Sequence, residues 1–287
     1  MSKKGLKTPL RYPGGKSRAC TKMGQFFPDL REYVEYREPF LGGGSVAIHV
    51  TKLYPHLKIT VNDLYEPLIN FWSNLQMFGT ELYTELKNLK IAHCNQDSAR
   101  CLFDVMRETI NDREKTDLDR AVAFYVVNKC SFSGLTESSS FSAQASDSNF
   151  SMRGIEKLLG YQEIISNWHI NQYSYEYCFR TDIHDGLFMY LDPPYDIKDN
   201  LYGKKGAMHK SFDHDKFAED CDQHNNIKML ISYNSDQLVK DRFKNWNAGE
   251  FDLTYTMRSV GDYMSDQQKR KELLLFNYKL SEVTVDG

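Results

Sequence analysis

Leu187-Phe188-Met189-Tyr190-Leu191 runs directly into Asp192-Pro193-Pro194-Tyr195, and this stretch decides the fold of the chain. The five apolar residues predict a buried strand. The two prolines cannot pair in a sheet, so the chain leaves the strand extended and rigid. In an open α/β sheet, ligands bind at the carboxyl ends of the strands. The sequence therefore predicts an acid, a backbone carbonyl and an aromatic ring at a ligand-binding edge.

The exocyclic amino group of a nucleobase suits this corner chemically. Its lone pair is delocalised into the ring, so the nitrogen is a poor nucleophile. The Asp192 carboxylate and the Pro193 carbonyl can accept hydrogen bonds from it and stabilise the positive charge that develops as it attacks an electrophile. The Tyr195 ring can stack on a base removed from its helix. The alternative is a Pro-Pro turn that carries a solvated aspartate.

The composition is that of an ordinary globular chain. It has 287 residues, of which 41% are hydrophobic and 26% charged. No run approaches the roughly 18 apolar residues of a membrane span. The six cysteines are scattered without a C-x-x-C pair, which disfavours a zinc site and a disulfide framework. We expect no metal, no secretory signal and a cytoplasmic location, in a prokaryotic cell or a virus-infected host.

Charge is unevenly distributed along the chain. Residues 1–37 carry nine Lys or Arg against three acids, a net charge of +6, whereas the whole chain carries −3. A basic segment is a candidate phosphate-contacting face, although an ordinary solvated surface has the same composition. A second basic stretch contributes further candidates for phosphate contacts, namely Lys204, Lys205 and Lys210.

A glycine-rich turn, Gly42-Gly43-Gly44, lies between a predicted strand and a helix predicted from about residue 45 to 54. Glycines there let the backbone approach a ligand closely. Asp63 ends a β-branched run 21 residues after Gly42. This is the position of the carboxylate that binds a ribose in a doubly wound nucleoside site. A helix N-cap for residues 66–78 is a second role that Asp63 can have.

Apolar spacing predicts the remaining elements. Helices are expected over most of 66–129 and at 154–166, and strands at 169–177, 228–233, 251–257 and 273–278. Nine of the 21 residues of 131–151 are serine, which predicts a surface loop. Gly14-Gly15-Lys16 lacks the glycine spacing of a nucleotide P-loop, so we expect a turn that presents an aromatic ring and a lysine to a ligand.

Five motifs in order make the chain resemble the Dam-like, D12 class family of DNA N6-adenine methyltransferases over roughly residues 8–279. They are Tyr12-Pro13-Gly14-Gly15-Lys16, Glu38-Pro39-Phe40-Leu41-Gly42-Gly43-Gly44, Asn62-Asp63, Asp192-Pro193-Pro194-Tyr195 and Arg270-Lys271-Glu272-Leu273-Leu274. The resemblance implies an α/β fold with a Rossmann-like S-adenosylmethionine-dependent methyltransferase sheet formed by residues 1–74 and 169–287. It implies an inserted, mainly helical target-recognition domain at residues 75–168.

The same resemblance implies S-adenosylmethionine as the methyl donor and assigns residues to two groups. The donor-binding group is Tyr12, Lys16, Pro39, Phe40, Gly42, Gly44, Asp63, Tyr177 and Asp192. The catalytic group is Asp192, Pro193, Pro194 and Tyr195. Within the first group, Asp63 would bind the ribose hydroxyls and Tyr177 would pack on the donor's adenine.

Double-stranded DNA is the substrate that the resemblance implies. Contacts are expected from Lys129, Ser133, Thr136, Glu137, Ser138 and the three lysines of the second basic stretch. Family members that read GATC carry a basic Arg-x-Asn element after an Asn-Gly-Leu-like segment, whereas here Ser133-Gly134-Leu135 is followed by Thr136-Glu137-Ser138. Without that arginine for bidentate contact to guanine, we expect a different short palindromic site. A cognate restriction endonuclease is a candidate partner, an orphan enzyme being the alternative, and the chain is expected to be a monomer or weak dimer.

The preferred prediction is methylation of a flipped adenine at N6, and three alternatives stay open. RNA N6-adenine methylation uses the same acceptor chemistry, and an Asp-Pro-Pro-Tyr corner also suits the N4 amino group of cytosine. A donor-binding or DNA-binding module without turnover is the third. The absence of a Pro-Cys nucleophile motif disfavours methylation at cytosine C5.

Overall fold

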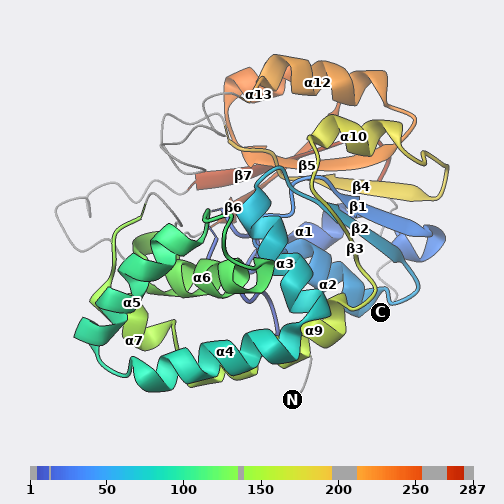
Figure 1. Cartoon of the computed structure of the whole chain (residues 1–287). Coiled ribbons are helices and arrows are strands. Elements are labelled where there is room, and N and C mark those ends of the chain that lie inside the picture. Colours follow the sequence, from blue (N-terminus) through green and yellow to red (C-terminus); the bar gives the residue numbers. More distant parts are fainter. Residues whose placement is uncertain (1–4, 13, 135–138, 196–211, 254–269, 281–287) are drawn as a thin grey trace, which may run out of the picture.

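The computed structural model describes residues 5–12, 14–134, 139–195, 212–253 and 270–280. Its centre is a seven-stranded sheet with the order β3-β2-β1-β4-β5-β7-β6 (Figure 1). Strands β1 to β5 are parallel, and β7 is antiparallel to both of its neighbours. The strands are β1 (Glu35–Glu38), β2 (Lys58–Asn62), β3 (His169–Asn171), β4 (Leu187–Leu191), β5 (Lys228–Asn234), β6 (Asn247–Leu253) and β7 (Arg270–Phe276). This sheet confirms the predicted Rossmann-like α/β class.

Both faces of the sheet are buried, which explains the continuous apolar run of β4. Leu187, Met189 and Leu191 pack on one face, and Phe188 and Tyr190 pack on the other. None of the five is more than 1% exposed. Side chains alternate between the two faces along a strand, so a strand covered on both sides needs an apolar residue at every position.

Helices cover the two faces of the sheet. Figure 1 shows α10, α12 and α13 on one side, and α1, α2 and α3 on the other. These helices are α1 (Cys20–Met23), α2 (Ser45–Leu53), α3 (Glu66–Met77), α10 (Tyr175–Arg180), α12 (His214–Gln223) and α13 (Gln237–Arg242). Within the ranges that the structure describes, no helix is both long and apolar enough to cross a membrane.

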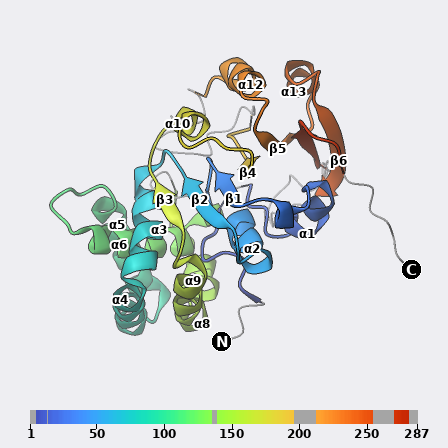
Figure 2. The ribbon, with the colours of Figure 1, turned by 90° about the vertical axis from the view of Figure 1, so that its right-hand side faces the viewer.

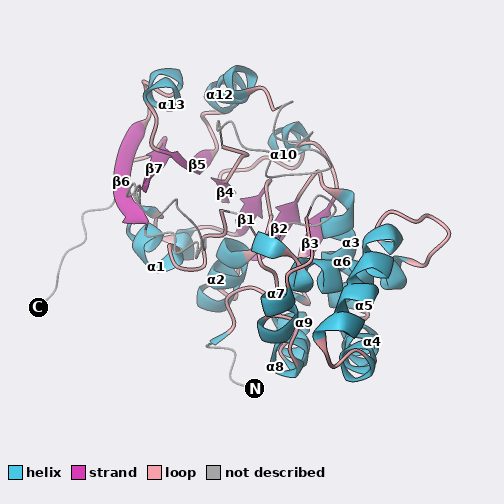
Figure 3. Ribbon diagram, turned by 90° about the vertical axis from the view of Figure 1, so that its left-hand side faces the viewer, coloured by secondary structure: helices cyan, strands magenta, loops and turns pink. Residues whose placement is uncertain are grey.

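A further group of helices packs beside α3, near β2 and β3 (Figures 2 and 3). They are α4 (Gly79–Ala92), α5 (Gln96–Thr109), α6 (Asp117–Cys130), α7 (Ala143–Ser148), α8 (Met152–Glu156) and α9 (Leu158–Ile165). One hydrophobic core extends from the sheet into this group, where the Phe71 ring of α3 stacks on Tyr125 of α6 with centroids 5.9 Å apart. The predicted domain boundary at residues 74 and 75 falls inside α3, and the division into two domains stays a prediction.

The described parts of 131–151, residues 131–134 and 139–151, are not the surface loop that their serine content predicted. The segment holds a 3-10 turn at Phe132–Gly134, an isolated bridge between Ser131 and Phe141, and α7. Phe150 and Ser146 are fully buried. The Ser142 hydroxyl accepts a hydrogen bond from the backbone N–H of Ala145 and so caps α7. Serines favour helix N-caps as well as loops, so composition alone misjudged this segment.

The strand predicted over residues 169–177 ends at Asn171 instead, and Tyr175 begins α10. The Asn62 amide explains the early end. Its Oδ1 accepts the Tyr173 N–H and its Nδ2 donates to the Tyr173 carbonyl, each at 2.9 Å. These two bonds occupy the backbone groups that would otherwise continue the ladder. The helix predicted at 154–166 is also divided, into α8 and α9.

Candidate active site

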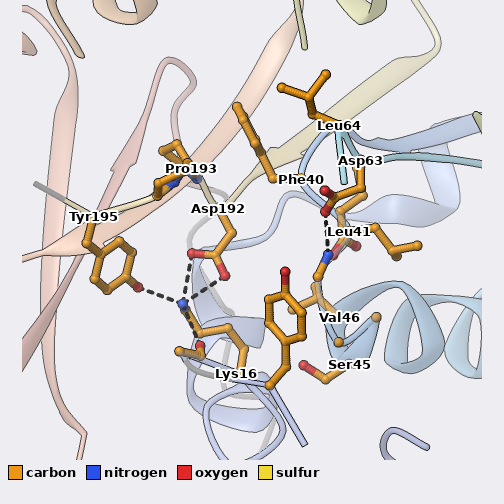
Figure 4. Close-up of a pocket in the computed structure, with 18 residues that line it drawn as sticks. Lys16, Phe40, Leu41, Ser45, Val46, Asp63, Leu64, Asp192, Pro193 and Tyr195 are labelled. Carbon is orange, nitrogen blue, oxygen red and sulfur yellow. Dashed lines mark hydrogen bonds and ion pairs between the residues drawn. The ribbon is translucent and has the colours of Figure 1, made fainter. Parts of the chain in front are cut away.

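A cavity opens at the carboxyl ends of β1, β2 and β4, and Figure 4 shows the residues around it. It holds about 740 Å³ of space, part of it open to solvent. Strands β2 and β4 flank β1, so the strand order reverses here, which is the usual ligand site of an open α/β sheet. The lining residues come from four segments: residues 12 and 14–16, residues 38 and 40–46, residues 63 and 64, and residues 192–195.

Lys16 and Asp192 form an ion pair at the base of the cavity. The Lys16 Nζ lies 2.8 Å from both Asp192 carboxylate oxygens and 2.6 Å from the Tyr195 hydroxyl (Figure 4). The lysine side chain is only 2% exposed. Burial alone would lower the pKa of Lys16, but the carboxylates of Asp192 and Glu272 raise it well above its ordinary value. Lys16 is therefore a buried ammonium ion.

Asp192 is also held from β5. The Ser232 hydroxyl donates to Asp192 Oδ1 at 2.8 Å, and the Tyr190 hydroxyl lies 2.9 Å from Ser232 Oγ. Ser232 and Tyr190 are buried and come from adjacent parallel strands. The carboxylate therefore has a fixed orientation before any ligand binds.

Tyr195 is fixed at its hydroxyl and on one face. The hydroxyl donates to the carboxylate of Glu272 on β7, and the ring stacks on Tyr233 with centroids 5.9 Å apart. Glu272 itself is nearly inaccessible, and burial raises its pKa. The sequence motif Arg270-Lys271-Glu272 contains this residue, but the sequence alone assigns it no role.

The glycine turn lies against the Tyr12 ring. A Cβ at Gly42 would lie 2.9 Å from the ring, and Gly42 has a positive φ of 48°. A Cβ at Gly43 would lie 2.9 Å from Tyr12 Cβ. Any side chain at these two positions would therefore push Tyr12 away from the turn.

Asp63 joins the end of β2 to the glycine turn. Its Oδ2 accepts the Gly42 N–H at 2.9 Å, and its Oδ1 accepts the Tyr65 N–H at 3.0 Å. Burial raises the pKa of Asp63. The N-cap of α3 is Tyr65, so the helix-capping role that Asp63 could have had is not observed. Leu64, beside it in the cavity wall, is 57% exposed.

Glu38 is a site residue that the sequence reasoning did not single out. Its carboxylate is buried in the cavity wall and accepts a 2.6 Å hydrogen bond from the Tyr36 hydroxyl. Burial raises its pKa well above the ordinary value. The available signal was its place directly before Pro39 and Phe40 in the donor motif. No sequence motif marks Ser232 or Tyr190 as a site residue in a comparable way.

Two residues of the predicted donor group lie behind or beside the cavity instead of in its lining. Pro39 is buried, and its carbonyl accepts from Asn62 Nδ2 at 3.1 Å. Tyr177 lies on α10, is 41% exposed and packs on Tyr173 with ring centroids 4.2 Å apart. Together with Tyr173, Tyr177 lines a separate shallow hollow. The structure therefore does not bring Tyr177 into the cavity with Asp63.

The expected DNA-binding residues are described only in part. Lys129 lies in the last turn of α6, with its Nζ 5.2 Å from the centre of the Tyr125 ring. Burial and the nearby cations of Arg11 and Lys157 lower the pKa of Lys129 to about 7. Ser133 lies in the 3-10 turn after α6. The other expected contacts lie outside the described residues, namely Thr136, Glu137, Ser138, Lys204, Lys205 and Lys210.

Asn128 ties the segment before the cavity to this turn. Its Oδ1 accepts the Arg11 N–H at 2.9 Å, and its Nδ2 donates to the carbonyls of Arg11 and Gly134 at 2.6 and 2.9 Å. Residues 11–16 thus connect the α6 end to the cavity. The segment that contacts the end of α6 is therefore the same segment that carries Tyr12 and Lys16.

Comparison with known proteins places these features in one family. Residues 12–257 match the D12 class N6 adenine-specific DNA methyltransferase family. The chain is 23% identical to type II methyltransferase M1.LlaDCHI of Lactococcus lactis subsp. cremoris, over 96% of this chain and 97% of that one. It is 21% identical to type II methyltransferase M.CviBI of Paramecium bursaria Chlorella virus NC1A, over 95% and 100%. A solved structure, the rRNA methyltransferase aviRa of Streptomyces viridochromogenes, matches with a TM-score of 0.34 and 12% identity over 91% and 84%, a similarity too distant to bear on function.

Proposed function

This chain belongs to the D12 class N6 adenine-specific DNA methyltransferase family, and we propose that it methylates N6 of an adenine flipped out of a short duplex DNA site. Membership of the family makes it a DNA methyltransferase with S-adenosylmethionine as methyl donor. The observation that carries the finer proposal is the shared cavity. Asp192, the glycine turn and Asp63 line it together, so an acceptor amino group and a nucleoside donor would meet there.

The residues present fit the donor. A carboxylate has about four acceptor positions, and Asp63 uses two of them for backbone N–H groups, so ribose hydroxyls can still donate to it. The Asp192 carboxylate lines the same cavity, and a carboxylate there suits a sulfonium cation. When bound, the donor supplies an electrophilic methyl group. We assign donor binding to Phe40, the glycine turn and Asp63.

The same cavity holds the groups that act on the acceptor. The Asp192 carboxylate and the Pro193 carbonyl accept hydrogen bonds from the adenine amino group. Asp192 stabilises the positive charge that the nitrogen gains in the transition state, and its fixed orientation avoids reorganisation at that moment. The Tyr195 ring, which packs on Tyr233, stacks on the flipped base. Transfer is direct, so the enzyme needs no covalent intermediate.

DNA recognition is assigned to the end of α6 and the turn after it. Lys129 and the neighbouring Arg11 and Lys157 supply positive charge there, which favours phosphate contacts. The segment that follows Ser133 has no arginine to read guanine as GATC-reading members do, so the proposed recognition site is a different one. The type II names of the relatives favour pairing with a restriction endonuclease.

One experiment tests the base, the atom and the site together. The chain is expressed in a methylase-deficient host, and plasmid DNA is sequenced by a method sensitive to methylation. We expect N6-methyladenine at one short motif other than GATC. N4-methylcytosine would assign the cavity to cytosine. If DNA carries neither mark, transfer of a tritiated methyl group from S-adenosylmethionine to structured RNA tests the remaining substrate. If no methyl group is transferred to RNA either, the remaining interpretation is a non-catalytic binding module.

A further inference from the structure

We propose that Glu272 is a positioning residue for methyl transfer: it fixes the Tyr195 hydroxyl and keeps the Lys16 ammonium paired when the target amino group binds Asp192. The inference rests on the proposed function and deepens it. Glu272 lies in a sequence motif, Arg270-Lys271-Glu272, to which the proposed chemistry gives no role.

Glu272 reaches the cavity from the antiparallel strand β7. It stands opposite Asn234 of β5 and Phe251 of β6, and neither neighbour carries a charge. Its side chain is 3% exposed, and its carboxylate contacts the Tyr195 hydroxyl and the Lys16 Nζ, the latter at 3.2 Å. Burying a carboxylate is costly unless it is paired, so these two contacts are what keep it there.

The target amino group must share the Asp192 carboxylate with Lys16. Lys16 donates to both Asp192 oxygens, and the base must bind the same carboxylate. A buried ammonium that lost its partner would oppose base binding strongly. Because Glu272 also contacts Lys16, the lysine keeps a second ionic partner when Asp192 accepts hydrogen bonds from the base.

Glu272 also sets the plane of the stacking ring. The Tyr195 hydroxyl contacts Glu272 and Lys16, and the ring stacks on Tyr233. Contacts at the hydroxyl and against Tyr233 restrict the plane in which the ring meets the base. Positioning of this kind accelerates a reaction because the entropy of ordering is lost before the base arrives.

Two conservative variants separate the two roles of Glu272, which are pairing with Lys16 and holding the Tyr195 hydroxyl. Glu272→Gln keeps an oxygen that can accept from the Tyr195 hydroxyl but removes the charge that pairs with Lys16. Tyr195→Phe keeps the ring but removes the hydroxyl. The matched control is Glu35→Gln on β1, since Glu35 is equally buried and ion-paired, with Arg37, but does not line the cavity.

The measurements are single-turnover methyl transfer to the recognised duplex, cofactor affinity and thermal unfolding. We expect Glu272→Gln to slow methyl transfer about 10- to 100-fold, with cofactor affinity within about threefold of wild type. Tyr195→Phe should also slow transfer, and the double variant should lose less than the product of the two single effects. Glu35→Gln should lower the melting temperature and leave the transfer rate within about twofold.

Two results would overturn the proposal. One is a transfer rate for Glu272→Gln within twofold of an active wild type. The other is a loss that merely follows thermal stability, with Glu35→Gln equally impaired at equal melting temperature. An inactive wild-type chain would instead refute the proposed function itself, and the role of Glu272 would fall with it. The wild-type assay thus distinguishes the two failures.

Discussion

The Lys16 ammonium group lies 2.8 Å from both carboxylate oxygens of Asp192, although 176 residues separate the two in the chain. One residue comes from the segment before α1 and the other from the end of β4. This pair joins the aromatic-glycine-lysine motif to the Asp-Pro-Pro-Tyr motif. It also holds in place the carboxylate that the proposed chemistry uses.

Replacing Asp192 by asparagine should abolish most methyl transfer. The change keeps the shape but removes the negative charge, so we expect the transfer rate to fall about 10²- to 10³-fold. Cofactor and DNA affinities should stay within about fivefold, which calorimetry and gel-shift titration can check. Asp29→Asn is the control, because Asp29 also pairs with a cation but does not line the cavity. Transfer by the Asp192 variant at one tenth of the wild-type rate would contradict the assigned role.

Asp63→Asn should weaken cofactor binding and leave DNA binding unchanged. An amide offers one oxygen where the carboxylate offers two, so the N–H of Gly42 or Tyr65 loses its acceptor. A hydrogen bond to a charged group contributes about 1.5–3 kcal/mol, so affinity should fall roughly 10- to 100-fold. Titration calorimetry with S-adenosylhomocysteine measures this. Asp236→Asn, which alters a carboxylate that accepts the Leu238 N–H outside the cavity, should leave affinity unchanged.

Gly42→Ala should destabilise the fold and the cofactor site together. The positive φ of 48° costs an L-residue about 1–2 kcal/mol, and the new Cβ would press on the Tyr12 ring. Urea unfolding should show that loss in the free energy of unfolding. Gly24→Ala is the matched control, since φ there is −54° and no atom lies within 4 Å of the added Cβ. Equal effects of the two substitutions would show that backbone strain at Gly42 is unimportant.

DNA binding should take up a proton near neutral pH through Lys129. Its pKa is lowered to about 7 in the folded protein, and a nearby phosphate would favour the charged form. DNA affinity at constant ionic strength should therefore fall as pH rises from about 6 to 8. Lys129→Met should flatten this slope, which fluorescence titration at several pH values measures. An identical slope in the variant would exclude Lys129 as its source.

The same lowered pKa has a consequence for stability. Between about pH 7 and 10.5 the unfolded chain holds the Lys129 proton and the folded chain does not. Unfolding then takes up a proton, so this residue's contribution to the free energy of unfolding rises with pH across that window. Urea titrations at pH 7 and 9 should show a smaller rise for Lys129→Met than for wild type.

Arg120 should couple the helical group to the sheet side of the molecule. It is 2% exposed and donates to both oxygens of Glu66 on α3, at 2.7 and 2.5 Å. Arg120→Met should lower the free energy of unfolding by about 3 kcal/mol while unfolding stays a single calorimetric transition. Arg113→Met, which removes a 70% exposed arginine from the same glutamate, should cost less than about 1 kcal/mol. A separate transition for the helices would instead favour an independent recognition domain.

Local patterns predicted the elements that carry the site. The apolar run before Asp192 has the length and burial of β4, and the glycine turn and Asp63 meet through one hydrogen bond across their 21-residue spacing. Strand periodicity and turn chemistry act over a few residues, so the sequence displays them directly. The sheet order and the cavity position then follow from general rules for α/β folds.

Long-range pairings could not be predicted in this way. Ser232 and Glu272 meet the catalytic corner from strands 40 residues after Asp192 and 77 residues after Tyr195. The motif at residues 270–274 contains Glu272 but gives it no role, and nothing in the sequence around Ser232 marks it as a polar residue of a buried site. The strand expected at 169–177 failed for the same reason, because the amide of Asn62, 111 residues away, redirects the chain at Tyr173.

The position of β7 determines when the sheet can be completed during synthesis of the chain. This strand is the last of the sheet in the chain, yet it lies between β5 and β6, which are made before it. On the ribosome β6 therefore has no described neighbour in the sheet until β7 emerges. A prematurely terminated polypeptide would carry Lys16 and Asp192 without the strand that closes their surroundings. The surroundings of the Lys16 and Asp192 pair are therefore completed only once residues 270–276 have been made.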